Sequence, residues 1–380
     1  MSEILSAPAP QVGNAESWTR REILQQPETL RATQALLRAR QAAIEAFLSP
    51  LLARNDLRIV LTGAGSSAFI GDSLAPWLSM VMGRSIEAIA TTDIVSAPAL
   101  HLRAGAPTLL VSFGRSGNSP ESAAAVDLTE ALVDSPHHLI ITCNAEGDLA
   151  RRAGANTHVV VLPDATHDRA FAMTSSFTAM MFAALSIFSG IATMEARAEV
   201  IAKALADTLM DADQRMAALV EHGFERVVYL GSGALKGLAR EASLKLLELT
   251  AGALVTAFDT PLGFRHGPKS IVTDRTLIVV FVSNDPLTRR YDCDMIEELR
   301  AEARCGAVLA VSAQPMEGDA LHIPHLEDAA DADLLIPFIL PAQLFGLHAS
   351  LKLGLMPDTP SPSGTVNRVV QGVRIHAIGA

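Results

Sequence analysis

Several patterns that define large protein classes are missing or scarce in this sequence of 380 residues. It has only three cysteines (Cys143, Cys293 and Cys305) and no C-x-x-C pair, which indicates a reducing compartment without disulfides or a zinc knuckle. No run of Lys or Arg occurs and the net charge is −11, so no nucleic-acid or membrane partner is expected. The first residues lack the basic and apolar regions of a signal peptide. We therefore expect a soluble, cytoplasmic protein.

Two long apolar stretches, 175–194 and 334–351, could be mistaken for membrane spans. The first is uncharged but contains Ser, Thr and Gly throughout, and the second is interrupted by Pro337 and Pro341. Both are predicted to be buried core helices. The chain is also longer than a single hydrophobic core usually allows, so two domains are expected.

Short apolar runs alternate with helical stretches from about residue 52 onward. Strands are predicted over 58–61, 108–113, 138–142 and 158–162, with helical patterns between them. Short buried strands separated by helices are typical of a parallel sheet. Before them, apolar residues at helical spacing predict a long amphipathic helix over 29–48, and irregular structure is expected ahead of that helix.

The second half of the sequence repeats the first at a constant offset. Residues 58–65 align with 226–233, 108–113 with 276–281, and 139–144 with 307–312, each shifted by 168 positions. Buried strands in general look alike, but likeness alone would not fix their spacing. The fold class is therefore predicted as α/β, with two tandem doubly wound αβα domains on parallel sheets. Predicted boundaries are 1–51 for an N-terminal helical segment, 52–200 and 218–355 for the domains, and 356–380 for a tail.

Two loops rich in Gly and Ser each follow a predicted strand and open a predicted helix. The first contains Gly65, Ser66 and Ser67. Backbone N–H groups at a helix N-terminus bind anions, and serine hydroxyls add neutral donors. A tight strand-to-helix turn would explain this loop equally well, and it is a poor match to a dinucleotide fingerprint.

The second loop strengthens the prediction of an anion site. Arg115, Ser116 and Ser119 surround a glycine between a strand and a helix, which suits a terminal phosphate monoester. Ser119 would also be a good N-cap before Pro120, and a capped helix end can itself bind an anion. A third cluster, Thr174 and Ser175, is a further candidate for phosphate contact, although helix capping explains it better.

Three charged residues, Glu241, Lys245 and Glu248, share one face of a predicted helix. Spacing alone favours an exposed ladder of salt bridges. Together with the loops G-A-G-S-S and R-S-G-N-S-P-E-S, and with His266 in G-F-R-H-G-P, they resemble the SIS (sugar isomerase) domain and the isomerase domain of glucosamine-6-phosphate synthase. Over nearly its whole length the chain resembles the AgaS family of tagatose-6-phosphate ketose/aldose isomerases, through F-A-M-T-S-S-F-T, T-P-L-G-F-R-H-G-P-K-S-I and S-P-S-G-T-V-N-R-V-V-Q-G-V.

The resemblance implies isomerisation with deamination of a 2-amino sugar 6-phosphate, converting galactosamine 6-phosphate to tagatose 6-phosphate and ammonia. Glu248 would be the base, with Glu241 and Lys245 orienting it or the substrate. His266 would open the sugar ring from a neighbouring subunit, which implies a homodimer or higher oligomer with shared sites. No cofactor is implied. The lysine that ends the synthase domain is replaced at its best matching position by Gln371.

Other functions remain compatible with the sequence. The same residues would serve a glucosamine-6-phosphate deaminase or a simple aldose–ketose isomerase, because one hydroxyl distinguishes the substrates. A sugar-phosphate sensor would need the loops but not Glu248 and His266, and no basic DNA-binding segment is evident before residue 52. A nicotinamide enzyme is disfavoured by the second serine loop. No histidine spacing predicts a metal site.

Overall fold

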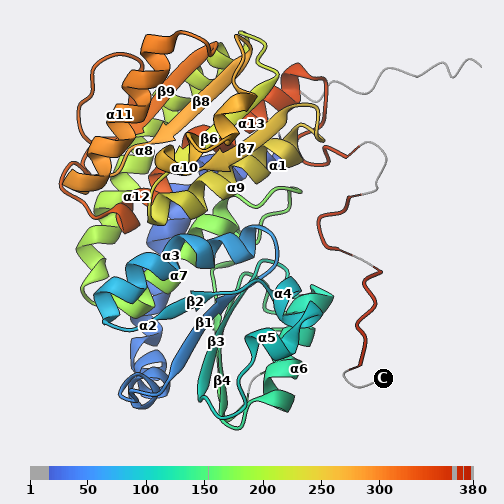
Figure 1. The fold of residues 1–380 in the computed structure, drawn as a ribbon. Helices are drawn as coiled ribbons and strands as arrows, with labels where there is room; N and C mark the ends of the chain where they lie inside the picture. The colour runs from blue at the N-terminus through green and yellow to red at the C-terminus, as the bar shows by residue number, and fades with distance from the viewer. Residues whose placement is uncertain (1–16, 153, 362–365, 371, 378–380) are drawn as a thin grey trace, which may run out of the picture.

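The computed structural model describes residues 17–152, 154–361, 366–370 and 372–377. The chain forms two five-stranded parallel sheets with helices on both faces. Figure 1 shows the sheets at opposite ends of the molecule, with α3 (Ser66–Met82) and α9 (Ala234–Leu249) between them. The first half comprises α1(Trp18–Leu24), α2(Gln26–Leu52), β1(Arg58–Thr62), α3, β2(Ile86–Ala88), α4(Thr91–Ser96), α5(Pro98–His101), β3(Thr108–Gly114), α6(Pro120–Leu132), β4(Pro136–Thr142), β5(Thr157–Val161) and α7(Ser175–Ser189).

The second half has the same strand order as the first. The order is β2-β1-β3-β4-β5 in one sheet and, read from the equivalent edge, β7-β6-β8-β9-β10 in the other, which confirms the predicted fold class. The elements of the second half are α8(Met194–Val220), β6(Arg226–Gly231), α9, β7(Val255–Asp259), α10(Pro261–Phe264), β8(Thr276–Phe281), α11(Pro286–Glu302), β9(Ala307–Ser312), β10(Ala320–His322), α12(Asp331–Phe338) and α13(Leu340–Lys352).

The alternation of side chains along the strands explains why each sheet carries helices on both faces. In the first sheet Ile59 and Leu61 belong to one large apolar cluster, whereas Val60 and Leu110 belong to a smaller cluster. The large cluster includes residues of both sheets, such as Tyr229 of the second sheet, so the core between the halves is continuous. Strands buried on both faces are typical of parallel sheets.

The sequence predicted the central strands and one edge strand, β5, but not the other three edge strands. β1, β3, β4, β5, β6, β8 and β9 lie where expected, while β2, β7 and β10 were not predicted. For the described residues before 29, the expectation of irregular structure was wrong, because α1 and the start of α2 lie there. The reason is tertiary: Asp358 from the far end of the chain accepts hydrogen bonds from Trp18 N at 2.9 Å and Thr19 N at 2.8 Å, which caps α1.

The repeat extends to the long helices that precede each sheet. α2 and α8 have 27 residues each, and their first residues, Gln26 and Met194, are again 168 positions apart. The predicted boundary at residue 200 therefore falls inside α8. In each half the long helix packs on the last helix, α2 on α7 and α8 on α13.

The two apolar stretches are core helices of the structure. α7 is buried along nearly its entire length. The run Asp331–Lys352 is long and apolar enough to cross a membrane, but 89% of its apolar window is buried inside the protein. Burial of this kind is what a core helix requires.

Candidate active site

The first serine loop makes a sharp turn between β1 and α3. Gly65 has a φ of +57°, a conformation that favours glycine, and a Cβ on Gly63 would lie 2.5 Å from the Cβ of Ser67. The turn places Ser66 and Ser67 in the first turn of α3, where backbone N–H groups have no helical partner. Ser66 and Ser67 face different neighbours: the Ser66 hydroxyl donates to Glu241 Oε1 at 3.0 Å, while Ser67 lines a cavity.

The second loop connects β3 to α6 and contains a buried arginine. Arg115 donates to the carbonyl oxygens of Ala170 at 3.1 Å, Phe171 at 2.8 Å and Arg368 at 2.7 Å. Its Nε atom is buried and has no hydrogen-bond partner among the described residues. Arg115 therefore organises the surrounding backbone and still has one N–H group to offer.

The two loops line one small cavity of about 110 Å³. Its polar lining consists of hydroxyl and guanidinium groups, from Ser67, Arg115, Ser116, Ser119, Ser122 and Arg368. Among the described residues, no Asp or Glu side chain lines this cavity. Ser119 is the N-cap of α6, as expected, but its hydroxyl donates to Glu121 Oε2 at 2.7 Å and makes no capping bond. A cavity with this lining at two helix N-termini favours an anion the size of a phosphate group.

Thr174 and Ser175 lie beside this cavity, at the start of α7, but they are not among its lining residues. The buried carboxylate of Asp168 accepts hydrogen bonds from Thr174 N at 2.8 Å, Ser176 N at 2.9 Å and the Ser175 hydroxyl. Asp168 thus satisfies the helix N-terminus from outside the helix. This arrangement favours a capping role for the third cluster.

Glu241, Lys245 and Glu248 of α9 form an ion-paired cluster beside the first loop. Lys245 Nζ lies 3.4 Å from Glu241 Oε1 and also forms an ion pair with Glu248. Glu241 and Lys245 are fully buried, whereas the Glu248 side chain is 22% exposed. The spacing alone had favoured an exposed ladder, and the structure excludes it. One carboxylate of the cluster is left accessible to a small molecule.

Burial and neighbouring charges set the protonation of this cluster. Burial raises the pKa of Glu241 to about 7, against the opposing effect of Lys245. Burial alone would lower the pKa of Lys245, but the carboxylates of Glu241 and Glu248 raise it. Burial and Arg368 lower the pKa of Arg115 to about 10, and the charge of Glu248 acts against them. The hydrogen bond from Ser66 to Glu241, next to the cavity residue Ser67, places the α9 cluster beside the phosphate-sized cavity.

His266 lies outside this cluster. It follows α10 in the second half, is exposed, and its side chain forms no hydrogen bond with the described residues. Its loop is held by neighbouring ion pairs, with Arg265 Nε 2.8 Å from Glu298 Oε2 and Lys269 also paired to Glu298. His266 is therefore on a fixed, solvent-facing loop and does not contact the Glu248 of its own chain.

Sequence reasoning missed two residues of this region, Arg368 and Asp168. Arg368 comes from the C-terminal tail, lines the cavity, and donates to the Asp168 carbonyl oxygen. Its Nε atom is buried without a partner among the described residues. The only sequence signal was its place in the closing V-N-R-V-V motif. Gln371, at the position that best matches the closing lysine of the synthase domain, lies outside the described residues.

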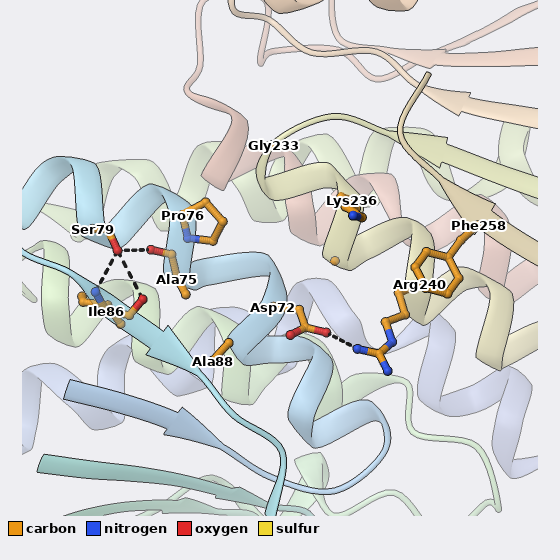
Figure 2. Close-up of a pocket in the computed structure, with 11 residues that line it drawn as sticks. Asp72, Ala75, Pro76, Ser79, Ile86, Ala88, Gly233, Lys236, Arg240 and Phe258 are labelled. Carbon is orange, nitrogen blue, oxygen red and sulfur yellow. Dashed lines mark hydrogen bonds and ion pairs between the residues drawn. The ribbon is translucent and has the colours of Figure 1, made fainter. Parts of the chain in front are cut away.

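A larger cleft of about 520 Å³ lies between α3 and α9 and contains none of the predicted site residues. Figure 2 shows Asp72 and Arg240 reaching toward each other across it, with an Asp72 Oδ2 to Arg240 Nη1 distance of 2.8 Å. The helices touch at the backbone beside this cleft, because a Cβ on Gly237 would lie 2.4 Å from Ser73 N. Within the described residues no group of three His, Cys, Asp or Glu side chains could hold a metal ion.

The chain is similar to known proteins in sequence and in fold. A family model for the SIS domain matches residues 51–189. The D-galactosamine-6-phosphate deaminase AgaS of Escherichia coli is 46% identical over 369 residues, covering 95% of this chain and 96% of that protein. The protein of the same name from a Shewanella species is also 46% identical, covering 94% and 92%. The crystal structure of tagatose-6-phosphate ketose/aldose isomerase from Escherichia coli has a TM-score of 0.88 and 42% identity, covering 98% of this chain and 100% of that one.

Proposed function

The chain belongs to the AgaS family, and on that premise we propose that it converts galactosamine 6-phosphate and water to tagatose 6-phosphate and ammonia. The observation that carries the proposal is the adjacency of two features. A cavity lined by serines and arginines lies beside a buried Glu–Lys–Glu cluster with one accessible carboxylate, and Ser66, the neighbour of the cavity residue Ser67, donates to Glu241 of that cluster. The first suits a phosphate monoester, and the second suits proton transfer on the attached sugar.

Glu248 is the proposed base because it is the accessible carboxylate of the cluster. In the open-chain aldehyde it removes the proton from C2, giving an enolamine, and returns a proton to C1. The C2 amine becomes an imine, and water hydrolyses the imine to the ketone and ammonia. Atoms balance with one water consumed, and no electron acceptor is needed.

Lys245 and Glu241 position the base. The ammonium of Lys245 lies between both carboxylates, so it fixes the side chain of Glu248 and holds negative charge next to the substrate. Glu241 in turn accepts from Ser66 in the first loop. The contact links the base helix to the phosphate cavity, so the two ends of the substrate are held by one connected network.

Ring opening is assigned to His266 of the partner subunit. An imidazole titrates near neutral pH and can transfer a proton between the ring oxygen and the anomeric hydroxyl. Exposure of His266 and its separation from Glu248 support a site shared between subunits of a homodimer. The few cysteines support a cytoplasmic location.

A substrate screen tests the function directly. Galactosamine, glucosamine and mannosamine 6-phosphates would be incubated with the enzyme, and ammonia and ketose measured separately. We expect equal amounts of ammonia and ketose, with the largest kcat/KM for galactosamine 6-phosphate. Faster turnover of glucosamine 6-phosphate would change the substrate assignment. Aldose phosphates without an amino group would be tested in parallel, and their conversion to ketoses would indicate a simple isomerase. Binding of all three without turnover would indicate a sensor.

A mixing experiment tests the shared site. Inactive Glu248→Gln and inactive His266→Asn proteins would be exchanged into hybrid dimers. About half of the dimers would be hybrids with one intact site each, so about a quarter of wild-type activity is the expected ceiling. Zero recovery after demonstrated exchange of subunits would place both residues in the same chain. An open-chain analogue that lacks both the C4 and the C5 hydroxyl, and so cannot close a five- or six-membered ring, should rescue His266→Asn if its role is ring opening.

A further inference from the structure

The C-terminal tail is bound to the body of its own chain only as far as the phosphate cavity. Arg115 donates to the Arg368 carbonyl oxygen at 2.7 Å, and Val369 and Val370 line the cavity. Beyond them, Gly372–Ala377 has no regular structure, and all six residues are exposed. None of the six forms a hydrogen bond with another described residue. Figure 1 shows this arm as an extended coil, in red, beside the first half.

The sequence of the arm is that of a β-strand. In Val373-Arg-Ile-His-Ala377, the side chains of Val373, Ile375 and Ala377 fall on one face and those of Arg374 and His376 on the other. Val373 is 36% exposed and Ile375 is 40% exposed. Ordering a backbone costs about 1–2 kcal/mol per residue, and no backbone hydrogen bond to another described residue offsets that cost in the arm. An extended amphipathic arm of this kind would be stabilised by a surface from outside its own chain.

A matching surface lies around β7 and α10. β7 pairs with β6 on one side, and its other edge pairs with no described strand. The exposed apolar side chains here are Val255 (52%), Phe258 (38%) and Leu262 (47%). The surface is hollowed rather than flat, because Phe258 forms one wall of the cleft in Figure 2. An open strand edge with apolar neighbours suits the addition of one more strand.

We propose that the arm Gly372–Ala377 of one subunit docks on the β7–α10 surface of a second copy. This inference rests on the proposed function in one respect, the shared site. If the partner's His266 reaches this chain's Glu248, the partner's β7–α10 surface lies next to the cavity from which the arm leaves. Six extended residues reach about 20 Å, which is sufficient for neighbouring surfaces. Docking would also couple subunit association to the phosphate cavity through Arg368.

Hydrogen exchange of the full chain tests the docking. In the dimer, the amides of Val373–Ala377 should exchange at least about 100-fold more slowly than in an unstructured peptide, and dilution to monomer should abolish that protection. Free exchange in an intact, active dimer would overturn the arm proposal and leave the proposed function standing. Protection that persists in the monomer would show that the arm binds its own chain and would likewise overturn it. An active monomer would overturn the shared site as well.

A disulfide cross-linking experiment tests whether the arm docks on the β7–α10 surface. Ile375→Cys combined with Phe258→Cys, in a background with Cys293→Ser and Cys305→Ser, should oxidise to a species of twice the chain mass. The matched control pairs Ile375→Cys with Val200→Cys, since Val200 is 39% exposed on α8, away from β7, and should give no such species. Removal of residues 373–380 should weaken dimerisation by at least about tenfold. Unchanged dimerisation together with equal cross-linking in both pairs would overturn the proposal.

Discussion

The two halves of the molecule share one backbone fold but carry different side chains at equivalent positions. The proposed site combines the loops of the first sheet with α9, and its counterpart, a cavity of about 640 Å³, combines the loops of the second sheet with α3. At the shared offset of 168, Lys245 corresponds to Trp77 and Glu248 to Met80, and both counterparts line the second cavity. The positions of Lys245 and Glu248 in one half are thus apolar in the other, and that of Glu241 is an uncharged serine, Ser73.

The loops differ as strongly as the helices. In the second half Asp285 accepts from Leu287 N at 3.1 Å and Thr288 N at 2.8 Å, and Asp331 accepts from the Ser283 hydroxyl at 2.6 Å. Carboxylates of the chain already occupy the donors that would face an anion. In the first half the equivalent loops leave serine hydroxyls facing a cavity. An anion site therefore depends on donors that the fold leaves available, and not on the fold alone.

The largest difference between the halves should appear in turnover. Glu248→Gln keeps the size of the side chain but removes the base, so kcat should fall by roughly 10²–10⁴ while substrate binding persists. Met80→Gln, at the equivalent position of the second half, is the matched control and should retain normal kcat. Near-normal turnover of Glu248→Gln would remove this residue from the mechanism. An equal loss of kcat in Met80→Gln would show that the two halves do not differ in their contribution to turnover.

Stability as a function of pH should distinguish the halves next. The folded pKa of Glu241, about 7, exceeds its ordinary value, so the folded state holds a proton that the unfolded state has lost. The contribution of Glu241 to the free energy of unfolding is therefore fully present below pH ~4.5. It decreases by up to about 3 kcal/mol as the pH rises to about 7. Urea unfolding of Glu241→Gln should show a flatter decline from pH 5 to 8. The equivalent variant, Ser73→Ala, should keep the wild-type slope, and equal slopes in all three proteins would contradict the assignment.

Phosphate affinity should respond to the first loops alone. Ser116→Ala or Ser119→Ala should weaken binding of the phosphorylated substrate by about 1–3 kcal/mol, the range for a hydrogen bond to a charged group. Inhibition by inorganic phosphate should weaken in parallel, whereas the unphosphorylated sugar should bind poorly to every form. Variants that lose stability but keep affinity would show that these serines only support the start of α6.

The smallest effect is expected in the second cavity. Asp328 lines this cavity, and neutralising it by Asp328→Asn leaves the carboxylates of Asp285 and Asp331 on their donors. Titration calorimetry should therefore give one phosphate site per chain for both wild type and variant, with kcat changed less than about twofold. A second site of similar affinity in either protein would show that the halves are more alike than their loops indicate.

The constant offset was sufficient to predict the fold, because buried strands such as 58–61 and 226–229 have strong local patterns. Three of the four edge strands were missed because β2 and β10 have three residues each and β7 has no fully buried residue, so their pairing depends on neighbours. The cavity serines were recognisable from their loops. Arg368 and Asp168 were not recognisable, because the fold brings these distant segments together and no local sequence pattern encodes that contact.

The backbone contact between α3 and α9 at Gly237 has a consequence for which sugars can react. Helices that touch at the main chain cannot slide past each other without a clash, so the span from the serine cavity to Glu248 is fixed. The fixed span therefore selects substrates by the length of their carbon chain. A pentose 5-phosphate, one carbon shorter, would still fill the cavity with its phosphate, but its C2 would stop short of the carboxylate. We expect such a compound to be an inhibitor and not a substrate.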